Sequence, residues 1–172
     1  MRRNLQSPAG PAVVVGERPV LRQAGVIPYR VVDGKVQVLL VTSRGSGRWI
    51  IPKGNVAAGS TALEAAEEEA FEEAGIKGVA DSAIPLGSYT YGKRLGSGDV
   101  RPAVVEVYLL RALRQVKKWR EKGQRMQEWV SIEQAIVRHD EPGLEPLLYG
   151  LLELETKLVQ DAETTSSARI VS

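Results

Sequence analysis

Three glutamates near the middle of the chain, Glu69, Glu72 and Glu73, have the spacing of a chemical site. On an α-helix, Glu72 lies roughly 60° to one side of Glu69 and Glu73 roughly 40° to the other, so the carboxylates share one face. Like charges at these spacings weaken a helix. The simplest compensating partner is a divalent cation, which binds oxygen ligands. The spacing therefore indicates a metal site.

The competing interpretation is a solvated acidic helix face, which is what most charge runs are. Two observations favour a site. No Lys or Arg occurs between Thr61 and Ile76, so no salt bridge within the helix offsets the acids. The helix also follows a loop containing Gly54 and Gly59, which comes after a strand-like segment at 49–51.

The helix that carries these glutamates has well-specified ends. Residues 61–64 match a capping box, in which the Thr61 hydroxyl and the Glu64 carboxylate satisfy backbone amides reciprocally. Gly75 stands where a left-handed residue ends a helix. Apolar residues at three- and four-residue intervals predict the buried stripe: Leu63, Ala66, Ala70 and Ala74. The glutamates lie off this stripe, so core packing does not explain them.

The other elements predict a mixed sheet between helices. Residues 23–30 and 36–43 read as strands around Asp33-Gly34, a strong hairpin signal. Further strands are expected at 49–51, 84–91, 103–110 and 129–131. Further helices are expected from 131 onward and at 142–157. Their order favours an α/β fold built as an α/β/α sandwich.

The length of 172 residues suits one domain with terminal extensions. We expect a flexible N-terminal arm at 1–18, the domain at 19–158, and a disordered Ser/Thr-rich C-terminal tail at 159–172. Without cysteine, the chain has no disulfide, thiolate metal site or cysteine nucleophile. Its apolar stretches are too short to span a bilayer. We therefore expect a cytoplasmic protein without membrane association.

The net charge of +2 does not indicate a nucleic-acid binder, but it hides a segregation of charge. The segment 111–125 contains several Lys and Arg residues against one acid, Glu121. A solvated basic face is one interpretation of this segment. Placed opposite a metal site, the same patch would suit a substrate that carries many phosphates.

Residues 54–76 resemble the signature of the Nudix hydrolases, and the likeness extends over roughly residues 20–150. The positions in register are Gly54, Glu69, Ala70, Glu72, Glu73, Gly75 and Ile76. Two positions depart from the signature. Ser60 stands at its first Glu, for which Glu64 is a candidate substitute, and Glu68 stands at its Arg. In the family that Arg orients a catalytic glutamate, so the departures bear on the catalytic rate.

The resemblance implies a metal-dependent hydrolase of phosphoric anhydride bonds. The implied catalytic and metal-binding residues are Glu69, Glu72 and Glu73, with Gly54 supplying a loop carbonyl to Mg²⁺ or Mn²⁺. Glu69 is the leading candidate for the base that takes a proton from the attacking water. Glu106, in a later strand, is either a distal acid or an outward-facing strand glutamate.

The flanking sequence is most similar to the diphosphoinositol polyphosphate and diadenosine polyphosphate hydrolases of this family. The segments that carry the likeness are 38–44, 48–52 and 125–129. The implied substrate-binding residues are Arg22, Arg44, Lys53 and Arg125, the arginines because a guanidinium pairs with two phosphate oxygens at once. The expected partner is a phosphorylated small molecule.

Two other functions stay open. Ser60 and Glu68 favour a Nudix-fold binding or regulatory module that has lost the chemistry. The basic segment 111–125 would suit an RNA-end pyrophosphohydrolase, although a nucleic-acid partner is not expected from the charge balance.

Overall fold

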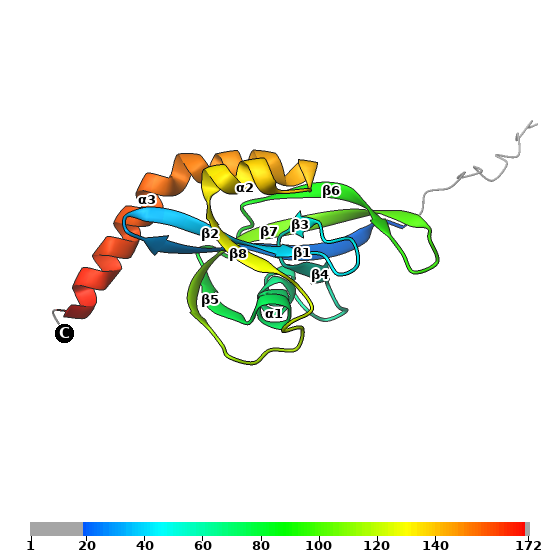
Figure 1. Cartoon of the computed structure of the whole chain (residues 1–172), viewed down its shortest axis with the longest axis horizontal. Coiled ribbons are helices and arrows are strands. Elements are labelled where there is room, and N and C mark those ends of the chain that lie inside the picture. The colour runs from blue at the N-terminus through cyan, green and yellow to red at the C-terminus, as the bar shows by residue number, and fades with distance from the viewer. Residues whose placement is uncertain (1–18, 171–172) are drawn as a thin grey trace, which may run out of the picture.

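Over residues 19–170, the part of the chain that the computed structural model describes, an eight-stranded mixed sheet lies between helices (Figure 1). The N-terminal arm predicted at 1–18 lies outside this part. The elements are β1 (Leu21–Val32), β2 (Lys35–Thr42), β3 (Trp49–Ile50), β4 (Lys53–Asn55), α1 (Ala62–Ala74), β5 (Ile76–Ala80), β6 (Gly87–Arg94), β7 (Val100–Gln115), β8 (Gln127–Ser131), α2 (Ile132–Arg138), the 3-10 helix η1 (Pro142–Leu144) and α3 (Glu145–Ile170).

Strands β1 and β7 run parallel along the middle of the sheet, from Leu21 opposite Ala103 to Tyr29 opposite Arg111. The main path of the sheet is β3-β2-β1-β7-β5, with β4 added to β1, β6 to β7 and β8 to β2. The hairpin between β1 and β2 turns at Asp33 and Gly34, whose φ angles of 51° and 70° are both positive. An Asp-Gly pair suits this turn, and the predicted hairpin is confirmed.

Side chains alternate between the two faces of the sheet and are buried on both. In β1, Ile27 and Tyr29 join the core beneath α2 and α3, whereas Ala24 and Val26 join the core against α1. Figure 1 shows α1 on one side of the sheet and α2 and α3 on the other. The predicted α/β/α sandwich is confirmed.

Helix α1 follows its sequence signals closely. The Thr61 hydroxyl accepts from the backbone of Glu64, whose carboxylate accepts in turn from the backbone of Thr61. Gly75 ends the helix in the left-handed conformation, with φ of 68°. Three residues of the predicted stripe are fully buried, namely Ala66, Ala70 and Ala74. The acidic helix is therefore fixed at both ends and along one face.

Two strands beside α1 were not predicted. Strand β4 contains polar residues and a glycine, and it exists because it pairs with β1, Gly54 lying opposite Ala24. Strand β5 begins directly after Gly75 and pairs with β7. Local sequence gives little signal for either, since a short strand depends on its neighbour in the sheet.

The C-terminal region differs from the prediction, because α3 continues through Ile170 instead of giving way to a disordered tail at 159. Residues 159–170 contain no Gly or Pro to end the helix. The hydroxyls of Thr164 and Thr165 donate to the carbonyls of Gln160 and Asp161. Among the described helices, none combines the length and apolar character needed to cross a membrane.

Candidate active site

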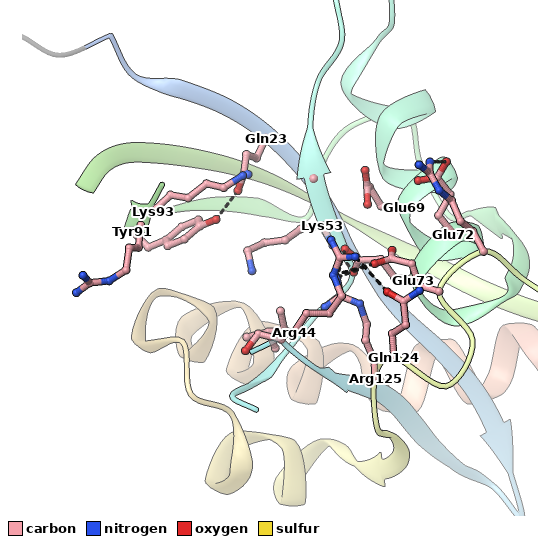
Figure 2. Close-up of a pocket in the computed structure, with 16 residues that line it drawn as sticks. Gln23, Arg44, Lys53, Glu69, Glu72, Glu73, Tyr91, Lys93, Gln124 and Arg125 are labelled. Atoms are coloured by element: carbon pink, nitrogen blue, oxygen red, sulfur yellow. Dashed lines mark hydrogen bonds and ion pairs between the residues drawn. The ribbon is translucent and has the colours of Figure 1, made fainter. Parts of the chain in front are cut away.

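A polar cavity of about 620 Å³ lies where α1, β4, β6 and the segment that leads into β8 meet (Figure 2). It brings together the predicted catalytic and metal-binding residues, Glu69, Glu72, Glu73 and Gly54. Three of the predicted substrate-binding residues also line it, namely Arg44, Lys53 and Arg125. Residues as far apart in the sequence as Arg44 and Arg125, which are 81 positions from each other, thus converge on one hollow.

Gly54 lies against Glu69 with no room for a side chain. A Cβ atom placed on Gly54 would stand 2.1 Å from Oε1 of Glu69. Such a distance is far below van der Waals contact, so a side chain at residue 54 would displace the Glu69 carboxylate from its present position. Glycine at this position therefore leaves the Glu69 carboxylate where it lies in the cavity.

Glu73 is a buried carboxyl held by donors on both of its oxygens. The backbone N–H of Lys53 donates to Oε2 at 3.3 Å, and Nη2 of Arg125 lies 3.1 Å from Oε1. Burial raises the pKa of Glu73 to about 8, and the negative charges of Glu69 and Glu121 act in the same direction, against the opposing effect of Arg125. A strongly shifted carboxyl in a polar cavity is typical of a functional site.

The other two glutamates lie closer to the cavity mouth. Burial raises the pKa of Glu69, and the negative charge of Glu72 adds to this shift. Glu72 is paired with Arg120, whose Nη1 lies 3.3 Å from its Oε1. Arginines from outside the helix therefore neutralise part of the negative charge for which a cation was predicted.

The donor chemistry of this cluster fits a divalent cation. Carboxylate oxygens are the ligands that Mg²⁺ and Mn²⁺ prefer. Burial is the main cause of the raised pKa of Glu69 and Glu73, and a cation would relieve the repulsion between carboxylates that adds to it. Within residues 19–170, no three His, Cys, Asp or Glu side chains already converge on one point. Glu72 and Glu73 instead face Arg120 and Arg125. Each carboxylate has further lone pairs, so a cation could share Glu72 and Glu73 with these arginines.

The segment between β7 and β8 docks on the C-terminal end of α1. The N–H of Val116 donates to the carbonyl of Gly75 at 2.9 Å, and that of Glu121 donates to the carbonyl of Glu72 at 3.1 Å. The indole of Trp119 covers Gly75 so closely that a Cβ there would lie 2.4 Å from it. This docking brings four residues of the segment to the cavity, namely Arg120, Glu121, Gln124 and Arg125.

Glu121 is a functional candidate that sequence reasoning missed. Its Oε1 lies 3.1 Å from Nε of Arg44 and 3.3 Å from Nη2 of Arg125. It stood out only as the single acid in a basic segment, a signal that gave no reason to place it at the site.

The basic segment 111–125 does not form one surface. Arg120 and Arg125 line the cavity, whereas Arg111, on β7, lines a separate hollow beside the C-terminal part of α3. The expectation of a single basic patch opposite the metal site therefore holds for only part of the segment.

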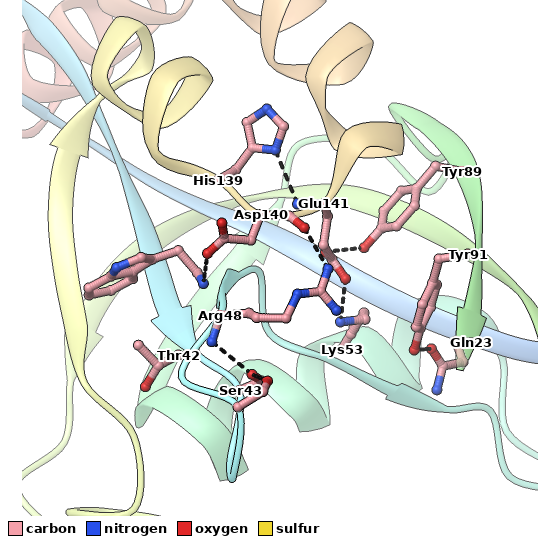
Figure 3. A network of polar contacts seen from close by, with 12 residues as sticks. Gln23, Thr42, Ser43, Arg48, Lys53, Tyr89, Tyr91, His139, Asp140 and Glu141 are labelled. Carbon is pink, nitrogen blue, oxygen red and sulfur yellow. Dashed lines mark hydrogen bonds and ion pairs between the residues drawn. The ribbon is translucent and has the colours of Figure 1, made fainter. Parts of the chain in front are cut away.

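Lys53 belongs to a buried polar network rather than presenting a free charge (Figure 3). Its Nζ lies 2.8 Å from Oε1 of Glu141, and the Tyr89 hydroxyl donates to Oε2 of the same carboxylate at 2.6 Å. The Lys53 and Glu141 side chains are 9% and 3% exposed. The structure thus places the predicted phosphate-binding charge of Lys53 in a buried ion pair, and Glu141 is a second acid that the sequence did not single out.

The loop that carries Glu141 is tied to the start of β3. The N–H of Trp49 donates to the Asp140 carboxylate at 2.7 Å, and the N–H of Asp140 donates back to the Trp49 carbonyl at 2.8 Å. Arg48 adds a bond to the Asp140 carbonyl (Figure 3). These contacts fix Glu141, and through it Lys53, from the opposite face of the sheet.

The wall opposite the glutamates is formed by β1 and β6. The Tyr91 hydroxyl donates to Gln23 at 2.6 Å, and Gln23 donates to Asn55 at 2.9 Å. Burial raises the pKa of Tyr91 to about 12. Lys93 and Arg94, which follow on β6, also line the cavity. This wall adds positive charge that could face a phosphorylated ligand.

Two candidates lie apart from the cavity. Arg22 pairs with Glu106, with 3.5 Å between Nη2 and Oε1, and neither residue is among those that line the cavity. Glu106 also accepts from the Tyr108 hydroxyl at 3.3 Å. This placement supports the outward-facing interpretation of Glu106 and separates Arg22 from the other candidate substrate contacts.

The protein-family comparison matches the NUDIX domain to residues 21–150. Among curated proteins, the chain is 29% identical over 131 residues to Nudix hydrolase 12, mitochondrial, of Arabidopsis thaliana, covering 66% of this chain and 63% of the relative. It is 32% identical over 126 residues to Nudix hydrolase 16, mitochondrial, of the same plant, covering 66% of this chain and 69% of the relative. The chain thus spans less than two thirds of the first of these relatives.

Among solved structures, the chain resembles an Ap4A hydrolase of C. elegans in a binary complex, with a TM-score of 0.60 and 25% identity. That match covers 78% of this chain and 97% of the other. The NUDIX domain of Shewanella oneidensis NrtR, complexed with ADP ribose, shares the fold at a TM-score of 0.56 and 16% identity, covering 78% and 90% of the two chains. Because the domain match spans most of the sequence and the glutamate helix faces a polar cavity, the chain belongs to the Nudix hydrolase family.

Proposed function

We propose that this protein is a metal-dependent pyrophosphohydrolase that cleaves phosphoric anhydride bonds in a highly phosphorylated small molecule. The observation that carries the proposal is the convergence of Glu69, Glu72 and Glu73 with basic side chains in one polar cavity. Anhydride hydrolysis needs both parts, because the carboxylates serve a cation and a water molecule while the basic groups bind phosphates.

The residues that would hold the cation are Glu69, Glu72 and Glu73, with the carbonyl of Gly54. Bound Mg²⁺ or Mn²⁺ supplies charge neutralisation and polarises a phosphoryl oxygen. Glu69 takes a proton from the attacking water, since its carboxylate borders the cavity beside the backbone of Gly54. The N–H of Lys53 keeps Glu73 against the floor of the site.

The substrate class follows from the charges at the cavity mouth. Arg44 and Arg120 have side chains that are 59% and 76% exposed, so their guanidinium groups are accessible to phosphate oxygens. Lys93 and Arg94 line the wall formed by β6. Several positively charged side chains around one cavity suit a dinucleoside polyphosphate or a diphosphoinositol polyphosphate. The likeness to an Ap4A hydrolase, which extends over 78% of this chain, supports the first of these.

The test is a substrate screen on the purified 172-residue chain. With Mg²⁺ or Mn²⁺, the protein should release phosphate or a nucleotide from at least one compound in a panel of dinucleoside polyphosphates and diphosphoinositol polyphosphates. A panel that shows no turnover with either metal would contradict the proposal. Tight binding of a panel compound without turnover would instead support a binding module, which the Ser60 and Glu68 departures favour.

An RNA-end pyrophosphohydrolase is the less favoured candidate. Its main support was the basic segment 111–125. Arg111 and Arg120 of this segment line different cavities, so the segment does not form one basic surface for RNA. Competition between capped or triphosphorylated RNA and the best small substrate would revive this candidate, whereas an absence of competition would exclude it.

A further inference from the structure

We propose that Arg125 is a positioning residue for Glu73 and does not bind substrate phosphates. The inference builds on the proposed function, in which Glu73 belongs to the reacting site. It replaces the expectation, drawn from sequence likeness, that Arg125 contacts the substrate.

Helix α1 provides no basic side chain for its own glutamates. No Lys or Arg occurs between Thr61 and Ile76, and position 68, next to Glu69, is an exposed glutamate. A buried carboxylate without a positive partner carries a large free-energy penalty. Any guanidinium that holds Glu73 must therefore come from another part of the fold.

Arg125 reaches Glu73 from the segment between β7 and β8. Its side chain is only 8% exposed, and Nη2 lies 3.1 Å from Oε1 of Glu73. The same nitrogen lies 3.3 Å from Oε1 of Glu121, and Nη1 donates to the carbonyl of Thr42 at 3.0 Å. The guanidinium is thus fixed by three groups and has little freedom to turn toward a ligand.

The two oxygens of Glu73 are held by different parts of the chain. Arg125 binds Oε1 and the backbone N–H of Lys53 binds Oε2. Figure 2 shows Arg125 approaching Glu73 below Lys53 and Glu69. Losing Arg125 would leave Glu73 with only one of these two donors, next to the repelling charges of Glu69 and Glu121. The carboxylate would then be free to leave its present position.

The burial of Arg125 is better explained by this task than by stability. Buried ion pairs are weak contributors to stability because both charges lose their hydration. In addition, Nε of Arg125 is buried with no hydrogen-bond partner among the described residues. An unsatisfied buried donor is explained by strain, by a catalytic role or by a water molecule or ion at that position. Arg44 and Arg120, by contrast, are exposed at the cavity mouth and remain available to phosphates.

The variant Arg125→Gln separates positioning from substrate binding. With the best anhydride from the screen, kcat should fall about 100-fold, because a small displacement of a reacting group is enough to cause such a loss. KM should change less than about threefold, since a residue that only binds substrate would raise KM instead. A rise in KM with unchanged kcat would overturn the proposal, and so would unchanged values of both.

A second readout does not depend on catalysis. The Lys53 amide donates to Glu73, so its NMR chemical shift and hydrogen-exchange rate in the metal-free protein report where the carboxylate lies. Both should change in Arg125→Gln, and an unchanged Lys53 amide would overturn the proposal. This measurement decides the matter even if the wild-type protein shows no turnover, which would count against the proposed function alone.

Two further variants address a purely structural role. Thr42→Val removes the hydroxyl that accepts from the N–H of Met126 at 2.9 Å, and so loosens the same segment without touching Glu73. If Arg125 merely anchors this segment, Thr42→Val should reproduce its kinetic effect, and the proposal fails. Arg125→Lys keeps the positive charge but lacks the forked N–H donors of a guanidinium. Compared with Arg125→Gln, it should restore part of kcat and part of the wild-type Lys53 amide signal. If Arg125→Gln does not fold, Arg125→Lys serves in its place. A wild-type kcat for Arg125→Lys would then refute the proposal that the guanidinium positions Glu73.

Discussion

Gly54 and Glu69 are in contact across the cavity floor, so that a Cβ on Gly54 would stand 2.1 Å from Oε1 of Glu69. The backbone of β4 can approach the carboxylate this closely only because residue 54 has no side chain. The contact joins the loop before α1 to the helix that carries the acids. The same closeness makes the Gly54 carbonyl a reasonable ligand for a cation held by Glu69.

The variant Gly54→Ala tests this contact. The added methyl group should push the Glu69 carboxylate aside, lowering kcat by about 100-fold, since misplacing a reacting group is costly. Folding should be preserved, because the colliding atom is the mobile end of a side chain and the φ angle of Gly54 is not in the left-handed region. Gly96→Ala is the matched control, with nothing within 4 Å of its Cβ. Wild-type kcat in Gly54→Ala would show that this contact has no part in activity.

Removing the charge of single glutamates tests the assigned chemistry. Glu72→Gln and Glu73→Gln should each abolish anhydride hydrolysis, a loss of at least about 100-fold, because an amide is a poor ligand for Mg²⁺ and cannot act as a base. Glu67→Gln is the control, since Glu67 is exposed on the same helix and does not line the cavity. Steady-state kinetics with Mg²⁺ and with Mn²⁺ would measure both effects. Equal losses in all three variants would point to helix charge rather than to a site.

The exposed arginines should differ according to their place in the structure. Arg44 lines the cavity, so Arg44→Ala should raise KM about tenfold, the effect of losing one charge-assisted hydrogen bond to phosphate. Arg22→Ala should leave KM within about twofold, because Arg22 pairs with Glu106 outside the cavity. The comparison uses one substrate at saturating metal. The reverse ranking would mean that the substrate extends beyond the cavity to Arg22.

Breaking the buried ion pair between Lys53 and Glu141 from one side should destabilise the fold, although the intact pair contributes little to stability. Glu141→Gln leaves the Lys53 ammonium buried without a negative partner, and the free energy of unfolding should fall by about 3–5 kcal/mol. Glu106→Gln breaks the more exposed pair with Arg22 and should lower it by less than about 1 kcal/mol. Urea unfolding of both variants provides the measurement. Similar small losses in both would show that Lys53 finds another partner or water.

The metal-free protein should lose stability as pH rises. The pKa of Glu73 is raised from 4.5 to about 8, so between these values the folded state binds more protons than the unfolded state. Raising the pH across this range therefore favours unfolding when EDTA is present. Thermal unfolding should show a Tm that falls from pH 5 to pH 8, with a smaller slope in Glu73→Gln than in Glu67→Gln. Identical slopes in the two variants would assign the pH dependence to other groups.

The sequence predicted the parts of the fold that depend on near neighbours. The capping box of Thr61 and Glu64 lies within one helical turn, and Gly75 ends the helix through its own backbone conformation. The Asp33-Gly34 turn depends likewise on adjacent residues. Where pairing across the sheet decided the outcome, as in β4 and β5, sequence patterns gave no usable signal.

The length of α3 shows a second limit of prediction from sequence. Its last turns are polar and exposed, which in sequence predicts disorder, yet the helix continues because no residue interrupts it. The glutamates of α1 are the opposite case. Their common face followed from helical periodicity alone, before any neighbour was known.

Only the tertiary structure decided which charges meet. Arg125 and Glu73 are 52 positions apart, and Lys53 finds its partner in Glu141, from a loop tied to the other face of the sheet. Periodicity specifies which side of an element faces the core, but not which distant side chain will lie opposite it. Such pairs depend on how the elements pack, because charged groups settle where burial leaves them a partner. The sequence thus determined the acidic helix and its family, while the packing determined which arginine holds a glutamate and which remains open to a ligand.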